Sequence, residues 1–279
     1  MQLAVNILVL AAIYALIACG YVLIYRVSRV LNLAHGELMM LGAYMLVATA
    51  SAFSMSPVMA VAIAALMSLA VGGMVYLFLM RRMTGEMVLA AVLTTVALGI
   101  LIRGAVILIW SAQQYHPRAM LGWGNPVITL PGDARISLYA ALLIVATVVG
   151  RWGMRMRAAG QDPLLAAQRG INLHAVFALA WGLSTFTGAL AGILIALDSG
   201  LDSTMVMIGL KAFPAALVGG LDSLAGALLG ALIIAAAEVG MIRFIDPLLA
   251  DVVPFIVLIA MLVIRPWGLF GTREELDRV

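Results

Sequence analysis

The chain alternates between long apolar runs and short polar breaks along its whole length. The runs cover residues 3–25, 38–53, 57–80, 87–110, 136–150, 175–197, 205–220, 224–241 and 248–264. A helix needs about 20 apolar residues to cross a bilayer core of about 30 Å. A chain of 279 residues with breaks this short holds roughly eight to ten such helices. The pattern therefore predicts an all-α polytopic membrane protein, with residues 1–279 forming a single transmembrane domain.

The overall composition agrees with a membrane protein. Hydrophobic residues make up 65% of the chain and charged residues 10%, whereas soluble domains are nearer half apolar and a quarter charged. This excludes a soluble enzyme, a disordered tail and a nucleic-acid-binding module. The net charge of +3 is too small for a phosphate-binding surface. Cys19 is the single cysteine, so neither an internal disulfide nor a thiolate metal cluster is expected.

Arginine clusters between the runs predict the orientation of the chain, because short cytoplasmic loops carry an excess of Lys and Arg. The clusters comprise Arg26 and Arg29; Arg81 and Arg82; Arg151, Arg155, Arg157 and Arg169; and Arg265, Arg273 and Arg278. They share one side if the N-terminus is outside and the C-terminus is cytoplasmic, with residues 111–135 outside. This requires that the short run 205–220 crosses the membrane. Lys211 and Pro214 interrupt that run, so both a broken helix and an ordinary short span remain open.

Charged and polar residues at or inside the runs are the candidates for function. A charge near the bilayer centre costs ~2.5–3.5 kcal/mol on insertion scales, so such residues face a partner or a cavity. Arg103 and Glu238 lie inside runs and fit either an ion pair between helices or a polar lining. We predict that the substrate pathway includes four polar residues, namely Asn32, His35, Glu37 and Lys211. The alternative is that these residues only cap helix ends or hold the two halves of the protein together.

Enzyme signatures are missing from the sequence. Lys211 is the only lysine and lies outside any phosphate-binding loop motif. The three histidines, His35, His116 and His174, belong to separate segments. We therefore expect no catalytic residue, no metal site and no cofactor in this chain.

Glycines recur at helical spacing in two places. Gly188 with Gly192, and Gly226 with Gly230, form Gly-x-x-x-Gly pairs that let helix backbones approach closely. The contact is either within this chain or with a second membrane subunit.

Residues 151–172 form the most distinctive polar segment. Asp162 is suited to cap a short helix that has Pro163 at its first position and ends near Gly170. Such a helix on the cytoplasmic side is either a solvated positive loop or a knob that docks into the groove of a partner.

Four sequence blocks together indicate a family. Ala166-Ala167-x-x-Gly170-Ile171-Asn172 resembles the coupling helix of ABC importer permeases. Residues 25–44, with Asn-Leu-Ala-His-Gly-Glu, resemble the N-terminal signature of branched-chain amino acid permeases. Residues 209–238 resemble the late block of that family, and residues 265–271 resemble its ending. Order and spacing are similar to the H-type (Liv) subunit.

This resemblance implies a permease with two inverted halves and broken helices, as in sugar and vitamin importers. It would move branched-chain or aliphatic amino acids from periplasm to cytoplasm by alternating access, in a bacterial inner membrane. The implied partners are a second (M-type) permease, two ATPases that hold ATP and Mg, and a periplasmic binding protein. The implied ATPase-coupling residues are Arg155, Arg157, Ala166, Ala167, Gly170, Ile171 and Asn172.

Two alternatives are also compatible with the sequence. Relatives within the same class carry urea or short amides. A different class would be an ion-coupled secondary transporter that uses Glu37, Arg103 and Glu238, although such a protein has no need of an ATPase-docking segment.

Overall fold

A computed structural model describes residues 1–52, 56–83, 86–130, 134–157 and 172–271 of the chain. Within these residues each apolar run contains a helix. The helices are α1 (Gln2–Ser28), α2 (His35–Ala52), α3 (Pro57–Phe78), α4 (Val88–Trp110), α6 (Leu138–Arg157), α8 (Leu173–Ser199), α9 (Val206–Gly219), α10 (Leu224–Phe244) and α11 (Val253–Ile264). The connections hold a hairpin of β1 (Val127–Leu130) and β2 (Ala134–Ser137), and the short helices η1 (Met80–Met83), α5 (Pro117–Met120), η2 (Ser203–Met205) and η3 (Pro247–Leu249).

The predicted all-α polytopic membrane fold is confirmed. Among the described residues, five helices are long and apolar enough to cross a membrane, namely α1, α3 with η1, α4, α8 and α10. Shorter apolar helices lie at Leu138–Thr147, Ser203–Gly219 and Val253–Ile264. The predicted run 136–150 was wrong at both ends. Ile136 and Ser137 pair with β1 in the hairpin, and α6 continues to Arg157.

Polar residues at the breaks determine where several helices begin and end. Ser56, Asn172 and Ser223 each occupy an N-cap position, where the side-chain oxygen accepts a hydrogen bond from a backbone N–H of the first turn. At the other end of α1, Arg29 adopts a left-handed conformation with φ of 54°, which ends the helix. The same polar residues that separate the apolar runs in the sequence therefore cap the helices.

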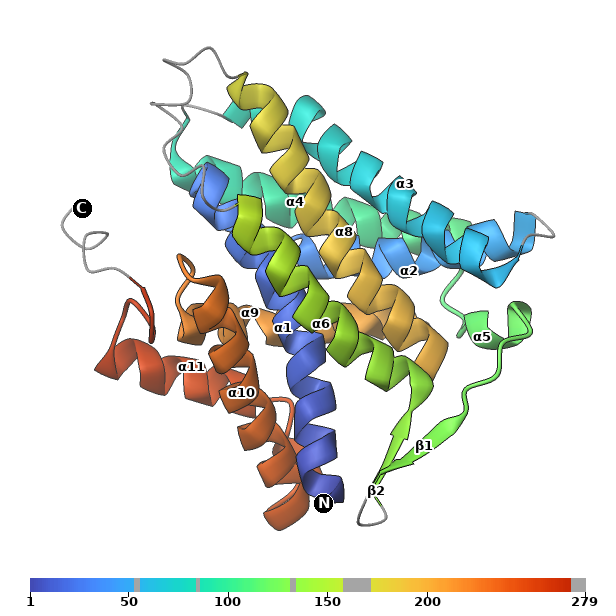
Figure 1. Cartoon of the computed structure of the whole chain (residues 1–279). Coiled ribbons are helices and arrows are strands. Elements are labelled where there is room, and N and C mark those ends of the chain that lie inside the picture. The colour runs from blue at the N-terminus through green and yellow to red at the C-terminus, as the bar shows by residue number, and fades with distance from the viewer. Residues whose placement is uncertain (53–55, 84–85, 131–133, 158–171, 272–279) are drawn as a thin grey trace.

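The helices form two sets of four with the same order and opposite direction. In α1–α4 and in α8–α11, a helix of 27 residues precedes a shorter helix and two further helices. Equivalent helices of the two sets make equivalent contacts. The first helix of each set packs on the third helix of the other set, as α1 does on α10 and α8 does on α3. The second helix of each set contacts the fourth helix of its own set, as α2 does with α4 and α9 does with α11. The beginning of α1 and the end of α8 lie at one end of the bundle, because Gln2 bonds to Arg135 and Asp198 bonds to nearby Ser137. Figure 1 shows the hairpin at the same end as the N-terminus. The arrangement is that of an inverted repeat.

Contacts between connections define the two ends of the bundle. The hairpin end also joins Tyr115 to Leu201 through an isolated β-bridge. At the opposite end, which we call the arginine end, Arg29 forms an ion pair with Asp222. The segment from Asp202, at the hairpin end, to Asp222 therefore passes from one end of the bundle to the other. Within it, α9 has 14 residues and a length of about 21 Å, which is less than the bilayer core of about 30 Å.

Pro214 does not divide α9, which is one continuous helix over Val206–Gly219. This helix belongs to the shorter apolar helices of the chain, and the crossing of the membrane by residues 205–220 stays a prediction.

Buried and exposed helices differ in position. Two-thirds of the apolar stretches of α1 and of α8 are buried, compared with 17% of that of α4. The exposed face of α4 carries large apolar side chains such as Ile100, Leu101 and Leu108, as expected for helices in contact with lipid or with another membrane subunit. The core thus lies where the two halves meet.

Candidate functional site

Two acidic side chains and one tyrosine lie around Lys211 of α9. Its Nζ donates to Oε1 of Glu238 in α10 at 2.8 Å and contacts Oδ1 of Asp251 at 2.5 Å. The Tyr14 hydroxyl of α1 donates to Oε2 of the same glutamate at 2.6 Å. The ion pair between helices that the sequence predicts for Glu238 is therefore confirmed, but its partner is Lys211 and not Arg103.

The three charges of this cluster differ in exposure. The side chain of Glu238 is 6% exposed and that of Lys211 13%, whereas that of Asp251 is 76% exposed. A buried ion pair is costly to break from one side, because the remaining charge is left without compensation. Glu238 thus provides a fixed counterion, while Asp251 is a second counterion in contact with solvent.

A cavity of about 380 Å³ adjoins Lys211 at the hairpin end. Its walls come from the end of α8, from η2, from the first turns of α9 and from the residue that precedes α11. Polar lining groups include Asp202 and Thr204, and apolar ones include Ile195 and Met205. The cavity therefore offers both charged and apolar walls, and we call it the Lys211 pocket.

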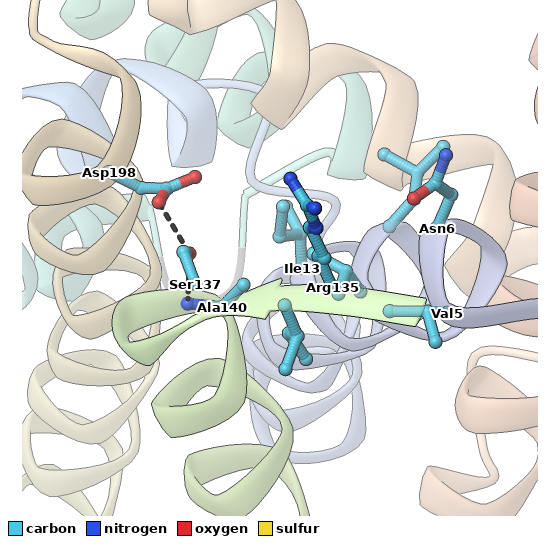
Figure 2. Close-up of a pocket in the computed structure, with 10 residues that line it drawn as sticks. Val5, Asn6, Ile13, Arg135, Ser137, Ala140 and Asp198 are labelled. Carbon is cyan, nitrogen blue, oxygen red and sulfur yellow. Dashed lines mark hydrogen bonds between the residues drawn. The ribbon is translucent and has the colours of Figure 1, made fainter. Parts of the chain in front are cut away.

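A second cavity, of about 360 Å³, lies at the same end between α1, β2, α6 and the end of α8. Figure 2 shows Arg135 and Asp198 at this cavity, with the Ser137 hydroxyl directed at the aspartate. That hydroxyl donates to Oδ1 of Asp198 at 2.6 Å, and the amide of Asn125 donates to the same oxygen at 3.0 Å. These bonds attach the hairpin region to α8. Sequence reasoning missed this site, because residues 111–135 contain no recognisable motif.

Asn32 and His35, two predicted pathway residues, lie inside the protein. They are 1% and 0% exposed. The His35 ring packs edge-on against Tyr21, with ring centroids 4.6 Å apart, and its Nδ1 is 3.5 Å from the Ser184 hydroxyl. Within the described part of the chain, the Nε2 atom of His35 and the amide nitrogen of Asn32 have no hydrogen-bond partner. Their role in a pathway stays a prediction.

Glu37, the third predicted pathway residue, is turned toward α4 and is half-buried. Its carboxylate carbon lies 3.1 Å from the position that a Cβ on Gly99 would occupy, so the absent side chain makes room for it. Arg103, one helical turn further along α4, interacts electrostatically with Glu37 and is exposed. This pair, unlike His35, reaches the surface of the protein.

The four predicted packing glycines lie at contacts between helices of this chain. Gly188 faces the His35 ring and Gly192 faces the backbone of Met39, both in α2. Gly226 and Gly230 of α10 meet α9 at Gly219 and at the carbonyl of Ala215. A β-carbon at most of these positions would overlap the neighbouring backbone.

Most of the predicted ATPase-coupling segment lies outside the described residues, including Ala166, Ala167, Gly170 and Ile171. Arg155 and Arg157 belong to the last turns of α6. Asn172 caps α8, because its Oδ1 accepts hydrogen bonds from the N–H groups of His174 and Ala175. The structure thus assigns a local structural role to Asn172, and the coupling role of the segment stays a prediction.

Sequence reasoning did not identify two members of the Lys211 cluster. Tyr14 lies in the middle of an apolar run, where an aromatic residue carries no functional signal. Asp251 lies in a connection far along the chain from Lys211, and only the fold brings them together. The one available signal was that a buried lysine requires an acidic partner.

The family model and the similar proteins found by comparison agree with one another. Residues 3–262 match the family described as branched-chain amino acid transport system / permease component. The permease protein LivH of Salmonella typhimurium, named for high-affinity branched-chain amino acid transport, is 28% identical over 100% of this chain and 97% of its own length. BraD of Pseudomonas aeruginosa, named for the same type of transport, is 29% identical over 100% of this chain and 98% of its own.

A relative from an archaeon and one solved structure complete these findings. The probable LivH of Methanocaldococcus jannaschii is 26% identical over 92% of this chain and 88% of its own length. Among solved structures, PsaBC from Streptococcus pneumoniae in complex with Fab matches with a TM-score of 0.47 and 12% identity, over 100% of this chain and 96% of that chain. Because the family match covers nearly the whole sequence, the chain belongs to the family of branched-chain amino acid transport permease components.

Proposed function

We propose that this chain is the H-type permease subunit of an ATP-driven importer that carries branched-chain or other aliphatic amino acids into the cytoplasm. The observation that carries the proposal is the family match over residues 3–262. The relatives named above are permeases of branched-chain amino acid transport, which favours amino acids over urea or short amides. The chain itself performs no chemistry, and ATP is hydrolysed by partner ATPases that hold ATP and Mg.

The distribution of charge supports an orientation with the N-terminus outside and the C-terminus in the cytoplasm. Arg26 and Arg29 end α1 and lie at the arginine end of the bundle, where short cytoplasmic loops carry such residues. Carboxylates gather at the hairpin end, which would face the periplasm of a bacterial inner membrane; they are Asp198, Asp202, Asp246 and Asp251. In this orientation the Lys211 pocket opens to the periplasm.

The exposed face of α4 is suited to the second, M-type permease. Arg103 is exposed there although it lies inside an apolar helix, and facing lipid would cost ~2.5–3.5 kcal/mol on insertion scales. A β-carbon on neighbouring Gly104 would meet no other atom within 4 Å, so a second helix can approach closely. The pathway would then run between the two permeases, next to Glu37 and Arg103.

Alternating access follows from the inverted repeat. Two halves of opposite direction that share one core can rock against each other and open the pathway to either side in turn. Energy would arrive through residues 151–172, where an ATPase would dock from the cytoplasm, while a binding protein would deliver substrate at the hairpin end.

Reconstitution tests this function directly. The chain is purified with its M-type permease and ATPases, placed in liposomes, and supplied with binding protein and leucine. We expect leucine uptake that requires ATP, together with leucine-stimulated ATP hydrolysis, and no uptake of urea. Uptake driven by an ion gradient without ATP would overturn the proposal.

One substitution separates transport from coupling. Gly170→Trp enlarges a residue of the predicted docking segment and should abolish both uptake and stimulated hydrolysis, while the permease pair still assembles. Normal uptake in this variant would show that residues 151–172 do not transmit the energy of ATP hydrolysis.

A further inference from the structure

We propose that the Lys211 pocket is the first binding site of the permease for its substrate, and that it holds the zwitterionic head group of an aliphatic amino acid between Lys211 and Asp251. The inference rests on the proposed function, because it names the site at which the transported amino acid contacts this chain. It identifies the ligand by its chemistry, which is one ammonium, one carboxylate and one aliphatic side chain.

The arrangement of charges gives Lys211 two counterions of different character. Glu238 is buried and is also bonded by Tyr14, so its position is fixed from two sides. Asp251 is 76% exposed and precedes α11 in a connection at the end of the bundle. Because the Asp251 side chain is exposed, water can solvate its carboxylate when it releases Lys211. Lys211 then keeps Glu238 as its counterion.

An amino acid can take the place of the Lys211–Asp251 contact. Its carboxylate would accept hydrogen bonds from the Lys211 ammonium, which carries three N–H donors. Its ammonium would be bound by the Asp251 carboxylate. The exchange keeps every charge paired, because the zwitterion inserts one negative and one positive group between a lysine and an aspartate. A ligand with only one of these charges would leave the other residue without a partner.

The rest of the pocket is suited to an aliphatic side chain. Ile195, Met205 and Ile208 line it, and methionine adapts to side chains of different shape. The volume of about 380 Å³ is near the lower limit of the ~300–1,000 Å³ typical of ligand sites, as expected for a ligand as small as leucine. The pocket thus offers a partner for each charged group of the amino acid and an apolar surface for its side chain.

The pocket also lies where a pathway would begin. Its lining includes Gln114, which follows α4, and Asp251, which lies shortly before α11. The helices α4 and α11 are the fourth helices of the two inverted halves. Because the proposed interface with the second permease is on α4, the pocket lies near the proposed pathway. Weak binding is appropriate here, because a substrate that is held tightly at the mouth of a pathway would not move on.

Protection of a single cysteine tests the site without requiring transport. Met207, which is 45% exposed and lines the pocket, is replaced by cysteine in a Cys19→Ser background within the complete transporter. Spheroplasts that have lost the binding protein are treated with an impermeant thiol reagent. We expect leucine to slow labelling about threefold at a concentration of about twice its Kd. Val127→Cys in the exposed hairpin is the control and should be unaffected.

Analogues and one variant separate the possible outcomes. Protection should be absent with 4-methylpentanoate, which lacks the ammonium, with 3-methylbutylamine, which lacks the carboxylate, and with glycine, which lacks the aliphatic side chain. It should also be lost in Asp251→Asn but kept in Asp246→Asn, another change of a carboxylate in the same connection. Absent protection by leucine, equal protection by the amine alone, or protection that survives Asp251→Asn would each overturn the inference. ATP-dependent leucine uptake, measured in parallel on wild-type liposomes, shows separately whether the proposed function holds.

Discussion

The short helices of the two inverted halves, α2 and α9, carry their polar residues in opposite environments. At the start of α2, Asn32 and His35 are buried and uncharged partners surround the imidazole ring. In α9, Lys211 is bound by two carboxylates and lines a cavity. The two helices cross each other where Gly36 meets Gly209. The same architecture therefore supports a closely packed polar junction in one half and an accessible charged cluster in the other.

The difference shows which half can change its contacts. His35 fits between α1 and α8 because Gly20 and Gly188 have no side chain at that level, so any larger residue would displace the ring. The Lys211 cluster depends on charge, and one of its carboxylates is exposed to solvent. We expect the first region to respond to added volume and the second to lost charge.

The largest effect should follow removal of the lysine charge. Lys211→Met leaves Glu238 buried without its counterion, and breaking a buried pair in this way costs about 3–5 kcal/mol. We expect a large fall in the unfolding temperature of the detergent-purified protein and less protein in the membrane. The double variant Lys211→Met with Glu238→Gln should recover most of the loss, because no uncompensated charge remains. A single variant as stable as wild type would contradict the assignment of Glu238 as a fixed counterion.

A smaller effect should follow added volume at the His35 junction. A β-carbon on Gly20 would lie 2.5 Å from Cε1 of His35, and overpacking of this kind costs about 1–3 kcal/mol. Gly20→Ala should therefore lower the unfolding temperature, although alanine is the better helix former. Gly240→Ala in α10 is the matched control, because its β-carbon meets nothing within 4 Å. There we expect unchanged or higher stability, since alanine favours a helix over glycine by about 0.8–1.0 kcal/mol.

Glu37 tests whether the predicted pathway residues act together or separately. Glu37→Gln keeps the size of the side chain and removes the charge near Arg103. We expect uptake to fall about tenfold, equivalent to about 1.4 kcal/mol at the limiting step, with assembly unchanged. Glu86→Gln, a change at an exposed glutamate outside the helices, should leave uptake unaltered. If Glu37→Gln transports normally, the α4 face is not part of the pathway.

The sequence predicts the helices well because each must be apolar over its whole length to lie in a membrane, and because the polar breaks contain their caps. Asn172 and Ser223, for example, lie where α8 and α10 begin. It also identifies Lys211 and Glu238 as unusual, since charges are costly in that setting.

The partners of these residues could not be read from the sequence. Glu238 pairs with Lys211 and not with Arg103, because which helices adjoin is determined by the packing of the two halves. The length of an apolar run does not indicate which other helices it packs against, so the sequence alone does not distinguish one pair of neighbouring helices from another. The hairpin of β1 and β2 could not be predicted for a different reason, because strands of four residues each give too short a pattern to be distinguished from a polar loop.

The smallest change in stability should come from the exposed member of the Lys211 cluster. Asp251→Asn removes a carboxylate whose side chain is 76% exposed, and Lys211 retains the buried carboxylate of Glu238 as its counterion. The unfolding temperature should thus shift little and resemble that of Asp246→Asn. Lys211 keeps Glu238 in this variant, so the buried pair is intact and only the second counterion is lost. If Asp251→Asn instead destabilised the protein as much as Lys211→Met, both carboxylates would be structural, and the accessible cluster of α9 would be as fixed as the junction at His35.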